Sequence, residues 1–198
     1  CIVLAASTPA NCFHFAYHAA KLAMEHMTPV ILLSDGYLAN GSELWKIPDV
    51  SKLPDIYPPL VKDDDKDYQP YQRDNDRLAR SWAFPGQPGL RHRIGGLEKA
   101  DITGDVSHDP MNHEWMVKTR KEKVERAANF IPEQEIEGAK KGELLVVGWG
   151  GTYGALTSAV QELAKAGHSI GLAQFNYIQP VPKNTREIFE RYEKIIVC

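Results

Sequence analysis

The chain has 198 residues, 43% of them hydrophobic and 25% charged, so it can bury a core and lacks the composition of a disordered segment. Its formal net charge of −3 indicates no nucleic-acid-binding surface, and no apolar run approaches the roughly 18 residues of a membrane-spanning helix. Cys1, Cys12 and Cys198 form no C-x-x-C pair, so they predict neither a zinc site nor an iron–sulfur cluster on this chain, and they fit the reducing cytoplasm.

Residues 1–40 predict a β-α-β unit. Residues 2–6 are an apolar strand, and Ser7-Thr8-Pro9 provides a helix cap with proline at the first helical position. The helix is expected over residues 9–26, with an apolar stripe made of Phe13, Ala16, Tyr17, Ala20, Met24 and Met27. Residues 30–34 form the second strand, whose unbroken Val/Ile/Leu run indicates that both faces are covered. Such a crossover requires parallel strands, so the loops after both strands share one sheet edge.

Residues 41–141 predict a proline-rich connector that ends in an amphipathic helix. The connector contains an acidic run at residues 63–67 and many turn pairs. Its aromatic residues need a surface to pack on, so we expect an ordered segment; they are Tyr57, Tyr68, Tyr71, Trp82 and Phe84. Helical periodicity returns at Asp109-Pro110 and ends at Pro132, with one apolar face made of Val117, Val124, Ala128 and Ile131.

Residues 142–198 predict a second α/β unit. A strand over residues 143–147 leads through a glycine turn at residues 148–154 into a helix over residues 155–166, which Gly167 caps. A strand over residues 170–175, a helix over residues 184–193 and a strand over residues 194–197 follow.

The glycine turn is one candidate cofactor site, through Gly148, Gly150 and Gly151. Glycines after a strand let a phosphate approach the backbone at a helix N-terminus. The register does not match the dinucleotide fingerprint, because Tyr153 stands where its last glycine would be, and no acidic residue ends the next strand. A tight structural turn or an inter-subunit contact is therefore favoured over nicotinamide binding, and an anion site stays open.

Ser34 and Asp35 are the other candidate cofactor residues, because they follow a buried strand at the edge where ligands meet parallel sheets. Capping of the next helix by Asp35 is the favoured alternative.

Arg91 and Arg93 could hold a substrate carboxylate or phosphate, or pair with the acidic run. A metal site at His108, Asp109, His113 and Glu114 is disfavoured by its spacing, and helix capping by Asp109 or Asn112 is preferred.

Four segments resemble the alpha subunit of 2-oxoacid:ferredoxin oxidoreductases, most closely the 2-oxoglutarate branch. They are Ala5-Ala6-Ser7-Thr8-Pro9, the run from Pro29 to Ala39, His92-Arg93-Ile94-Gly95-Gly96-Leu97 with His108-Asp109, and Val146-Val147-Gly148-Trp149-Gly150-Gly151-Thr152. The resemblance implies the C-terminal part of a pyrimidine-type thiamine-diphosphate domain at residues 1–40, the connector at 41–141, and a truncated transketolase-C-terminal-like domain at 142–198. Both ends of the chain are expected to be cut from a longer subunit.

The same resemblance implies oxidative decarboxylation of a 2-oxoacid to an acyl-coenzyme A, with electrons passing to ferredoxin. Thiamine diphosphate with Mg²⁺ and a [4Fe-4S] cluster are expected mainly on a partner beta subunit, in an oligomeric complex. The family's main catalytic residues fall upstream of Cys1, so none is assigned here and the fragment alone is expected to be inactive. A non-catalytic assembly module and a nicotinamide-binding reductase remain as alternatives.

Overall fold

The computed structural model describes residues 1–63 and 65–198, so Asp64 of the predicted acidic run lies outside the described residues. Its first unit contains β1 (Ile2–Ala5), α1 (Asn11–His26) and β2 (Val30–Leu33). The two strands are parallel, with Ile2 opposite Val30 and Ala5 opposite Leu33, which confirms the predicted β-α-β unit. The helix begins at Asn11 rather than at residue 9, because the Asn11 side chain accepts hydrogen bonds from the amides of Ser7 and Thr8 and holds them in a turn.

The helix α1 packs on the sheet through a different face from the predicted stripe. Leu22 lies in one core cluster with Ile2 and Leu4 of β1, and Phe15 and Ala19 pack against that cluster. The predicted stripe instead faces the connector. The Phe13 ring lies 5.7 Å from that of Trp45, and the Tyr17 hydroxyl donates to the Pro54 carbonyl at 2.8 Å. The helical period is therefore confirmed, but some apolar residues of α1 pack against the sheet and others pack against the connector.

The expectation that both faces of β2 are covered is wrong. β2 is an edge strand of a three-stranded sheet in the order β2-β1-β6, and the Ile31 side chain is 48% exposed. Val30 and Leu32, on the other face, pack in the core cluster. The unbroken apolar run thus places one face in the core and one face at the surface.

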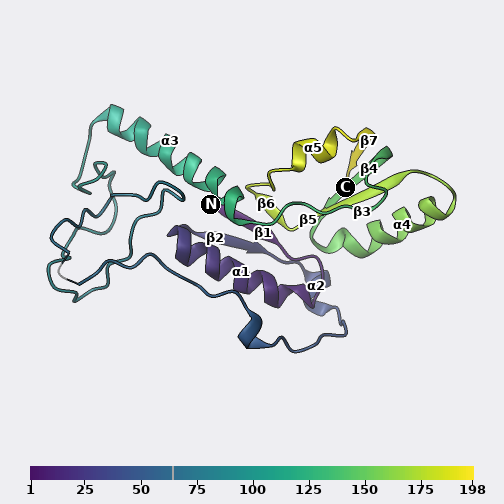
Figure 1. Cartoon of the computed structure of the whole chain (residues 1–198), viewed down its shortest axis with the longest axis horizontal. Coiled ribbons are helices and arrows are strands. Elements are labelled where there is room, and N and C mark those ends of the chain that lie inside the picture. The colour runs from purple at the N-terminus through teal and green to yellow at the C-terminus, as the bar shows by residue number, and fades with distance from the viewer. Residues whose placement is uncertain (64) are drawn as a thin grey trace.

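The part of the connector that follows its 3₁₀ turn forms a lobe beside the first unit, on the side away from the second sheet (Figure 1). The connector contains a 3₁₀ turn (Val50–Lys52) and isolated bridges, and the short helix α2 (Gly36–Asn40) precedes it. Its aromatic residues pack only in part as predicted, because the Tyr57 and Phe84 side chains are 72% and 51% exposed. The Trp82 indole donates to the Met24 carbonyl at 2.8 Å, and the Tyr68 ring contacts that of His92. Lys99 is buried, and its ammonium group donates to the carbonyls of Gly95, Gly96 and Leu97.

The helix α3 (Pro110–Arg126) continues as a 3₁₀ turn (Ala127–Phe130) and returns the chain to the core. The Asp109 carboxylate accepts a hydrogen bond from the Met111 amide at 3.0 Å, which confirms the predicted cap. The predicted apolar face is partly wrong, since Val117 is 46% exposed. The side chains that α3 and its 3₁₀ turn bury are Met116, Thr119, Val124 and Ala127.

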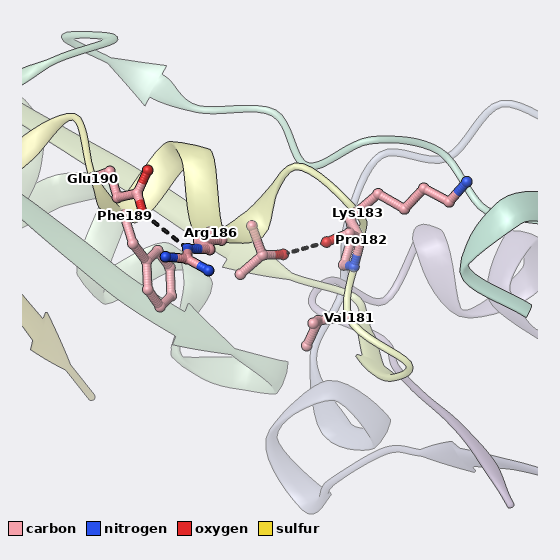
Figure 2. Close-up of a pocket in the computed structure, with 7 residues that line it drawn as sticks. Val181, Pro182, Lys183, Arg186, Phe189 and Glu190 are labelled. Carbon is pink, nitrogen blue, oxygen red and sulfur yellow. Dashed lines mark hydrogen bonds and ion pairs between the residues drawn. The ribbon is translucent and has the colours of Figure 1, made fainter. Parts of the chain in front are cut away.

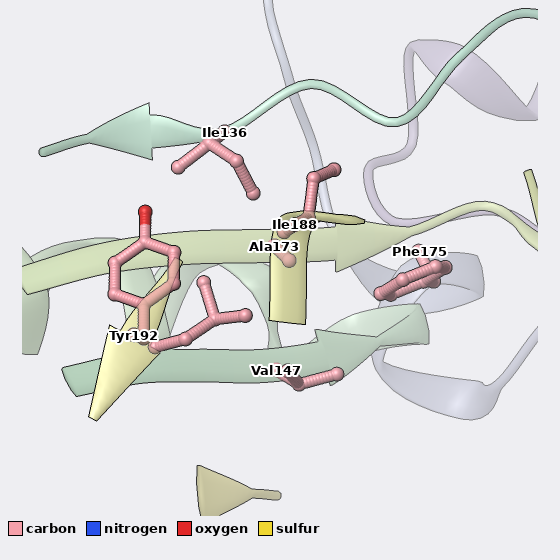
Figure 3. Close-up of a cluster of buried hydrophobic side chains, with 7 residues drawn as sticks. Ile136, Val147, Ala173, Phe175, Ile188 and Tyr192 are labelled. Carbon is pink, nitrogen blue, oxygen red and sulfur yellow. The ribbon is translucent and has the colours of Figure 1, made fainter. Parts of the chain in front are cut away.

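The second sheet has the order β3-β5-β4-β7, from β3 (Glu137–Gly138), β4 (Gly142–Trp149), β5 (Ile170–Phe175) and β7 (Tyr192–Val197). Strands β4, β5 and β7 are parallel. Leu145 and Val147 point to one face, where they pack with Ile188 of α5 (Thr185–Phe189; Figure 3). Val146 points to the other face, where it packs with Val160 of α4 (Tyr153–Lys165). Alternation along a continuous apolar strand thus builds a helix–sheet–helix sandwich.

The last predicted helix and strand have shifted boundaries. The helix α5 is shorter than the predicted range of 184–193, and β7 begins at Tyr192 rather than at residue 194. The Tyr192 ring is buried in the core cluster beside α5, so tertiary packing extends the strand at its start.

The two sheets are joined through β6 (Tyr177–Gln179), which follows β5 and pairs antiparallel with β1. Asn176 lies at the junction. Its carbonyl accepts from the Ala5 amide at 2.8 Å, and its side-chain amide donates to the Ala5 carbonyl at 2.8 Å. The segment predicted as a separate C-terminal unit therefore contributes one strand to the N-terminal sheet. No helix among the described residues is long and apolar enough to cross a membrane.

Candidate functional site

The structure brings together two candidate segments that are more than one hundred residues apart in sequence. The loop after β2 carries Ser34 and Asp35, and the glycine turn after β4 forms a 3₁₀ segment, Gly150–Thr152. The Asp35 carboxylate accepts a hydrogen bond from the Gly151 amide at 3.2 Å. The carboxyl ends of strands from both sheets therefore meet at one place, as expected for a ligand-binding edge in α/β folds.

Asp35 has two structural partners. One carboxylate oxygen accepts from the Leu38 amide at 2.8 Å and caps the short helix α2, which confirms the favoured capping role. The other oxygen accepts from the Gly151 amide. A negative charge already beside this amide disfavours the approach of a pyrophosphate, so the geometry supports the tight-turn interpretation over dinucleotide binding.

Two glycines of the turn permit close approach. A Cβ atom at Gly151 would lie 2.5 Å from Oδ2 of Asp35, and one at Gly148 would overlap the Leu156 side chain of α4. Gly150 has φ = 63°, in the left-handed region that favours glycine. The glycines are thus required by packing and backbone conformation, whether or not a ligand is bound.

The two loops enclose a pocket of about 430 Å³. Four of the five predicted cofactor residues line it, namely Ser34, Asp35, Gly150 and Gly151, whereas Gly148 lies behind it under α4. Sequence reasoning missed the large side chains at its mouth, Tyr37 and Trp149, which are 78% and 48% exposed. Their position next to the two candidate loops was the only signal in the sequence. An aromatic mouth over backbone amides and a carboxylate suits a flat ring system with a polar group.

The Ser7–Thr8 loop follows β1 at the same sheet edge but lines a different, polar cavity of about 660 Å³. There the Tyr177 hydroxyl lies 2.8 Å from Nδ1 of His18. Burial raises the pKa of Tyr177 to about 12. Burial, and then the charges of His14 and Lys21, lower the pKa of His18. Both groups are consequently neutral near pH 7 and form a neutral hydrogen bond.

The predicted substrate residues lie elsewhere. Arg91 and Arg93 are exposed on the connector, and neither lines the pocket formed by the Ser34 and Gly151 loops. The disfavoured metal cluster is divided between other roles, since Asp109 caps α3 and the His113 ring lies 2.7 Å from the Glu98 carboxylate. Across residues 1–63 and 65–198, no three His, Cys, Asp or Glu side chains gather as a metal ion would require.

A further pocket lies where β6 leads into α5 and has a volume of about 580 Å³ (Figure 2). Two of its polar side chains, Arg186 and Thr185, are engaged with neighbours. The Arg186 guanidinium pairs with Glu190 at 2.9 Å, and the Thr185 hydroxyl donates to the Pro182 carbonyl at 2.6 Å. It contains none of the candidate residues.

Comparison with known proteins assigns the chain to a family. The family model described as "Pyruvate flavodoxin/ferredoxin oxidoreductase, thiamine diP-bdg" matches residues 1–111, which extends through the connector to the start of α3. "2-oxoglutarate oxidoreductase subunit KorA" of Mycobacterium tuberculosis is 44% identical over 195 residues, covering 98% of this chain and 29% of that protein. "2-oxoglutarate synthase subunit KorA" of Methanothermobacter thermautotrophicus is 26% identical and covers 99% of this chain and 51% of that protein.

A solved structure agrees with these relatives. It is described as "2-oxoglutarate:ferredoxin oxidoreductase from Magnetococcus marinus with 2-oxoglutarate, coenzyme A and succinyl-CoA bound". It superposes with a TM-score of 0.85 at 26% identity, over 99% of this chain and 34% of that chain. The chain thus spans between about a third and a half of the length of these relatives. It belongs to the pyruvate flavodoxin/ferredoxin oxidoreductase family, whose model covers its first 111 residues.

Proposed function

We propose that this chain is part of the alpha subunit of a 2-oxoglutarate:ferredoxin oxidoreductase. In the proposed reaction 2-oxoglutarate loses CO₂, its acyl group passes to coenzyme A, and two electrons leave singly to ferredoxin. The observation that carries the proposal is the 44% identity to the mycobacterial 2-oxoglutarate oxidoreductase subunit over 98% of this chain. The solved relative, whose description names 2-oxoglutarate and coenzyme A, supports the same substrate.

The residues of this chain do not fit a complete site for thiamine diphosphate and Mg²⁺. Among the described residues, Asp35 is the one carboxylate side chain that lines the pocket between the Ser34 and Gly151 loops, and it already accepts from two amides. The [4Fe-4S] cluster likewise needs four cysteines, whereas this chain has three, at Cys1, Cys12 and Cys198. Mg²⁺ and the cluster are therefore assigned to a beta subunit in this proposal.

We assign the pocket between the Ser34 and Gly151 loops a supporting role in the assembled enzyme. Ser34, Asp35, Gly150 and Gly151 would form one side of the thiamine-diphosphate cleft, facing the ring system of the cofactor rather than its diphosphate, and the partner subunit would complete the cleft. The division at residues 40 and 141, with a transketolase-C-terminal-like last unit, belongs to the same proposal. The helix–sheet–helix sandwich of residues 142–198 supports it, and the free thiols support a cytoplasmic location. Arg91 and Arg93 stay as candidate substrate residues on the connector.

The test uses the full-length subunit co-expressed with its beta subunit. Reduction of a viologen dye is measured with 2-oxoglutarate, pyruvate and branched 2-oxoacids, each with and without coenzyme A. Coenzyme A-dependent reduction that is fastest with 2-oxoglutarate supports the proposal. Absence of reduction with every acid, from a complex shown to contain thiamine diphosphate and an intact cluster, overturns it and favours an assembly role.

A matched pair of serine variants tests the supporting role of the pocket. Ser34→Ala is expected to raise the thiamine diphosphate concentration that gives half-maximal activity, whereas Ser158→Ala, on the exposed face of α4, is expected to leave it unchanged. If both variants need the same thiamine diphosphate concentration for half-maximal activity, Ser34 is not part of the proposed cleft.

A further inference from the structure

A basic pocket lies at the opposite edge of the first sheet from the pocket between the Ser34 and Gly151 loops. It has a volume of about 400 Å³ and is lined by Cys1 before β1, by Thr28 and Pro29 before β2, and by side chains of the connector and of α3. Because β1 and β2 are parallel, these residues lie at the amino-terminal edge of the sheet. The pocket is therefore separate from the proposed cofactor cleft.

Four cationic side chains line this basic pocket, namely Arg73, Arg80, Arg120 and Lys123. Two of them are neutralised by carboxylates. Arg73 pairs with Asp101 at 2.5 Å, and Arg120 forms two hydrogen bonds with Glu98, at 3.1 and 3.2 Å. Within the described part of the chain, Arg80 and Lys123 have no carboxylate at salt-bridge distance.

The Lys123 ammonium is held in an unfavourable environment. It donates one hydrogen bond, to the Met27 carbonyl at 2.9 Å. Burial, followed by the charges of Arg80 and Arg73, lowers the pKa of Lys123 to about 8, and Asp74 opposes this shift. A partly buried cation next to two guanidinium groups costs free energy unless an anion joins them.

Arg80 is held in place by its neighbours rather than by a counter-ion. Its guanidinium lies 4.3 Å from the centroid of the Tyr71 ring, and one of its nitrogens lies 3.4 Å from the Pro70 carbonyl. The Tyr71 amide in turn donates to the Ile102 carbonyl at 2.9 Å, which fixes this part of the connector. Among the described residues, the Pro70 carbonyl is the one hydrogen-bond partner of the Arg80 guanidinium, so most of its five N–H donors can bind a ligand.

We propose that Arg80 and Lys123 bind a phosphate group at this pocket, either as free phosphate or as part of a nucleotide. A phosphate carries up to two negative charges, which matches the two cations that lack a carboxylate. A guanidinium can bind two phosphate oxygens at once, and an ammonium adds a point charge. This site goes beyond the proposed oxidoreductase activity and does not depend on it.

The experiment is calorimetric titration of the full-length subunit, assembled with its beta subunit, with sodium phosphate at constant ionic strength and without 2-oxoacid. Arg80→Gln and Lys123→Gln are the test variants. Lys121→Gln is the matched control, because Lys121 is exposed on the same helix, pairs with Glu125 and does not line the pocket. Circular dichroism confirms that each variant folds.

We expect the wild type and Lys121→Gln to bind phosphate equally, and each test variant to bind it at least about tenfold more weakly, since a charge-assisted hydrogen bond is lost. No phosphate binding to the wild type overturns the proposal, as does binding that both test variants retain. Tighter binding of ADP than of phosphate identifies a nucleotide as the source of the group. Succinate binding as tightly as phosphate overturns the assignment to phosphate.

Discussion

At the residue scale, Asp35 connects two loops that the chain supplies more than one hundred residues apart. Its carboxylate caps α2 through the Leu38 amide and holds the Gly151 amide. We expect Asp35→Ala to lower the free energy of unfolding by about 1–2 kcal/mol, since it removes a helix cap and a second hydrogen bond. Urea unfolding of the full-length subunit measures this.

The control for that variant is Asp35→Asn, which keeps a side-chain oxygen for the Leu38 amide. Asp35→Asn should lower the free energy of unfolding by less than half as much as Asp35→Ala does. If both substitutions lower the free energy of unfolding equally, the charge of the carboxylate rather than its capping geometry stabilises the loop.

His26 makes the stability of the protein depend on pH. Its side chain is fully buried, and neither ring nitrogen has a hydrogen-bond partner among the described residues. Burial, with smaller contributions from Arg77 and Lys123, lowers its pKa from 6.5 to about 4. The unfolded chain therefore takes up a proton at higher pH than the folded chain does. The free energy of unfolding should fall as the pH drops from about 6.5 to about 4, by on the order of 3 kcal/mol.

Unfolding midpoints measured across this pH range test the assignment. His26→Phe keeps a ring against Phe130, which lies 5.1 Å away, and should remove this part of the pH dependence. His14→Phe, at an exposed position of the same helix, should retain it. Parallel pH profiles for the wild type and His26→Phe would contradict the prediction.

At the scale of elements, the turn after β4 needs a glycine because α4 packs directly on the end of that strand. A Cβ atom at Gly148 would overlap the Leu156 side chain, whereas one at Gly154, in the first turn of α4, would meet nothing within 4 Å. We expect Gly148→Ala to destabilise the protein by about 1–3 kcal/mol through overpacking. Gly154→Ala should be neutral or stabilising by up to about 1 kcal/mol, because alanine favours the helix.

Thermal or urea unfolding of the full-length variants compares the two substitutions. A double mutant cycle then identifies the cause. In a Leu156→Ala background the cost of Gly148→Ala should fall, since the overlapping methyl group is gone. If Gly148→Ala destabilises the Leu156→Ala background as much as the wild type, the added methyl group overlaps Gln174 or Thr152 instead.

At the scale of the whole molecule, Asn176 joins the two sheets where β5 passes into β6. Its side-chain amide donates to the Ala5 carbonyl at 2.8 Å and to the Ser7 hydroxyl at 3.1 Å. We expect Asn176→Ala to cost about 1–3 kcal/mol, because it leaves a buried carbonyl without its side-chain donor.

Hydrogen exchange measured by mass spectrometry shows which strands are destabilised in Asn176→Ala. Amides of β1 and β6 should exchange faster in Asn176→Ala, while those of β4 should keep their protection, because β4 is covered by α4 and α5. Faster exchange throughout β4 would indicate that the second sheet depends on this junction for its own stability.

Local patterns in the sequence determined the elements. Proline and capping residues marked the ends of α3, and apolar runs identified β1, β2, β4 and β5. The length of each crossover required the strands to pair in parallel. The candidate residues at the ends of β2 and β4 were found for the same reason, since ligand-binding loops follow parallel strands. These inferences depend on interactions within a few residues or on the general geometry of α/β units.

Only the tertiary structure decided which faces are covered and which loops meet. Periodicity shows that α1 has an apolar stripe, but not that Phe13 and Tyr17 face the connector while Leu22 faces the sheet. An apolar strand can lie at an edge, as Ile31 shows, if a single face is packed. The contact of Asp35 with Gly151 and the clustering of Arg80 with Lys123 join distant segments. Such contacts depend on how sheets and connector pack together, and residue spacing within each segment carries no information about that packing.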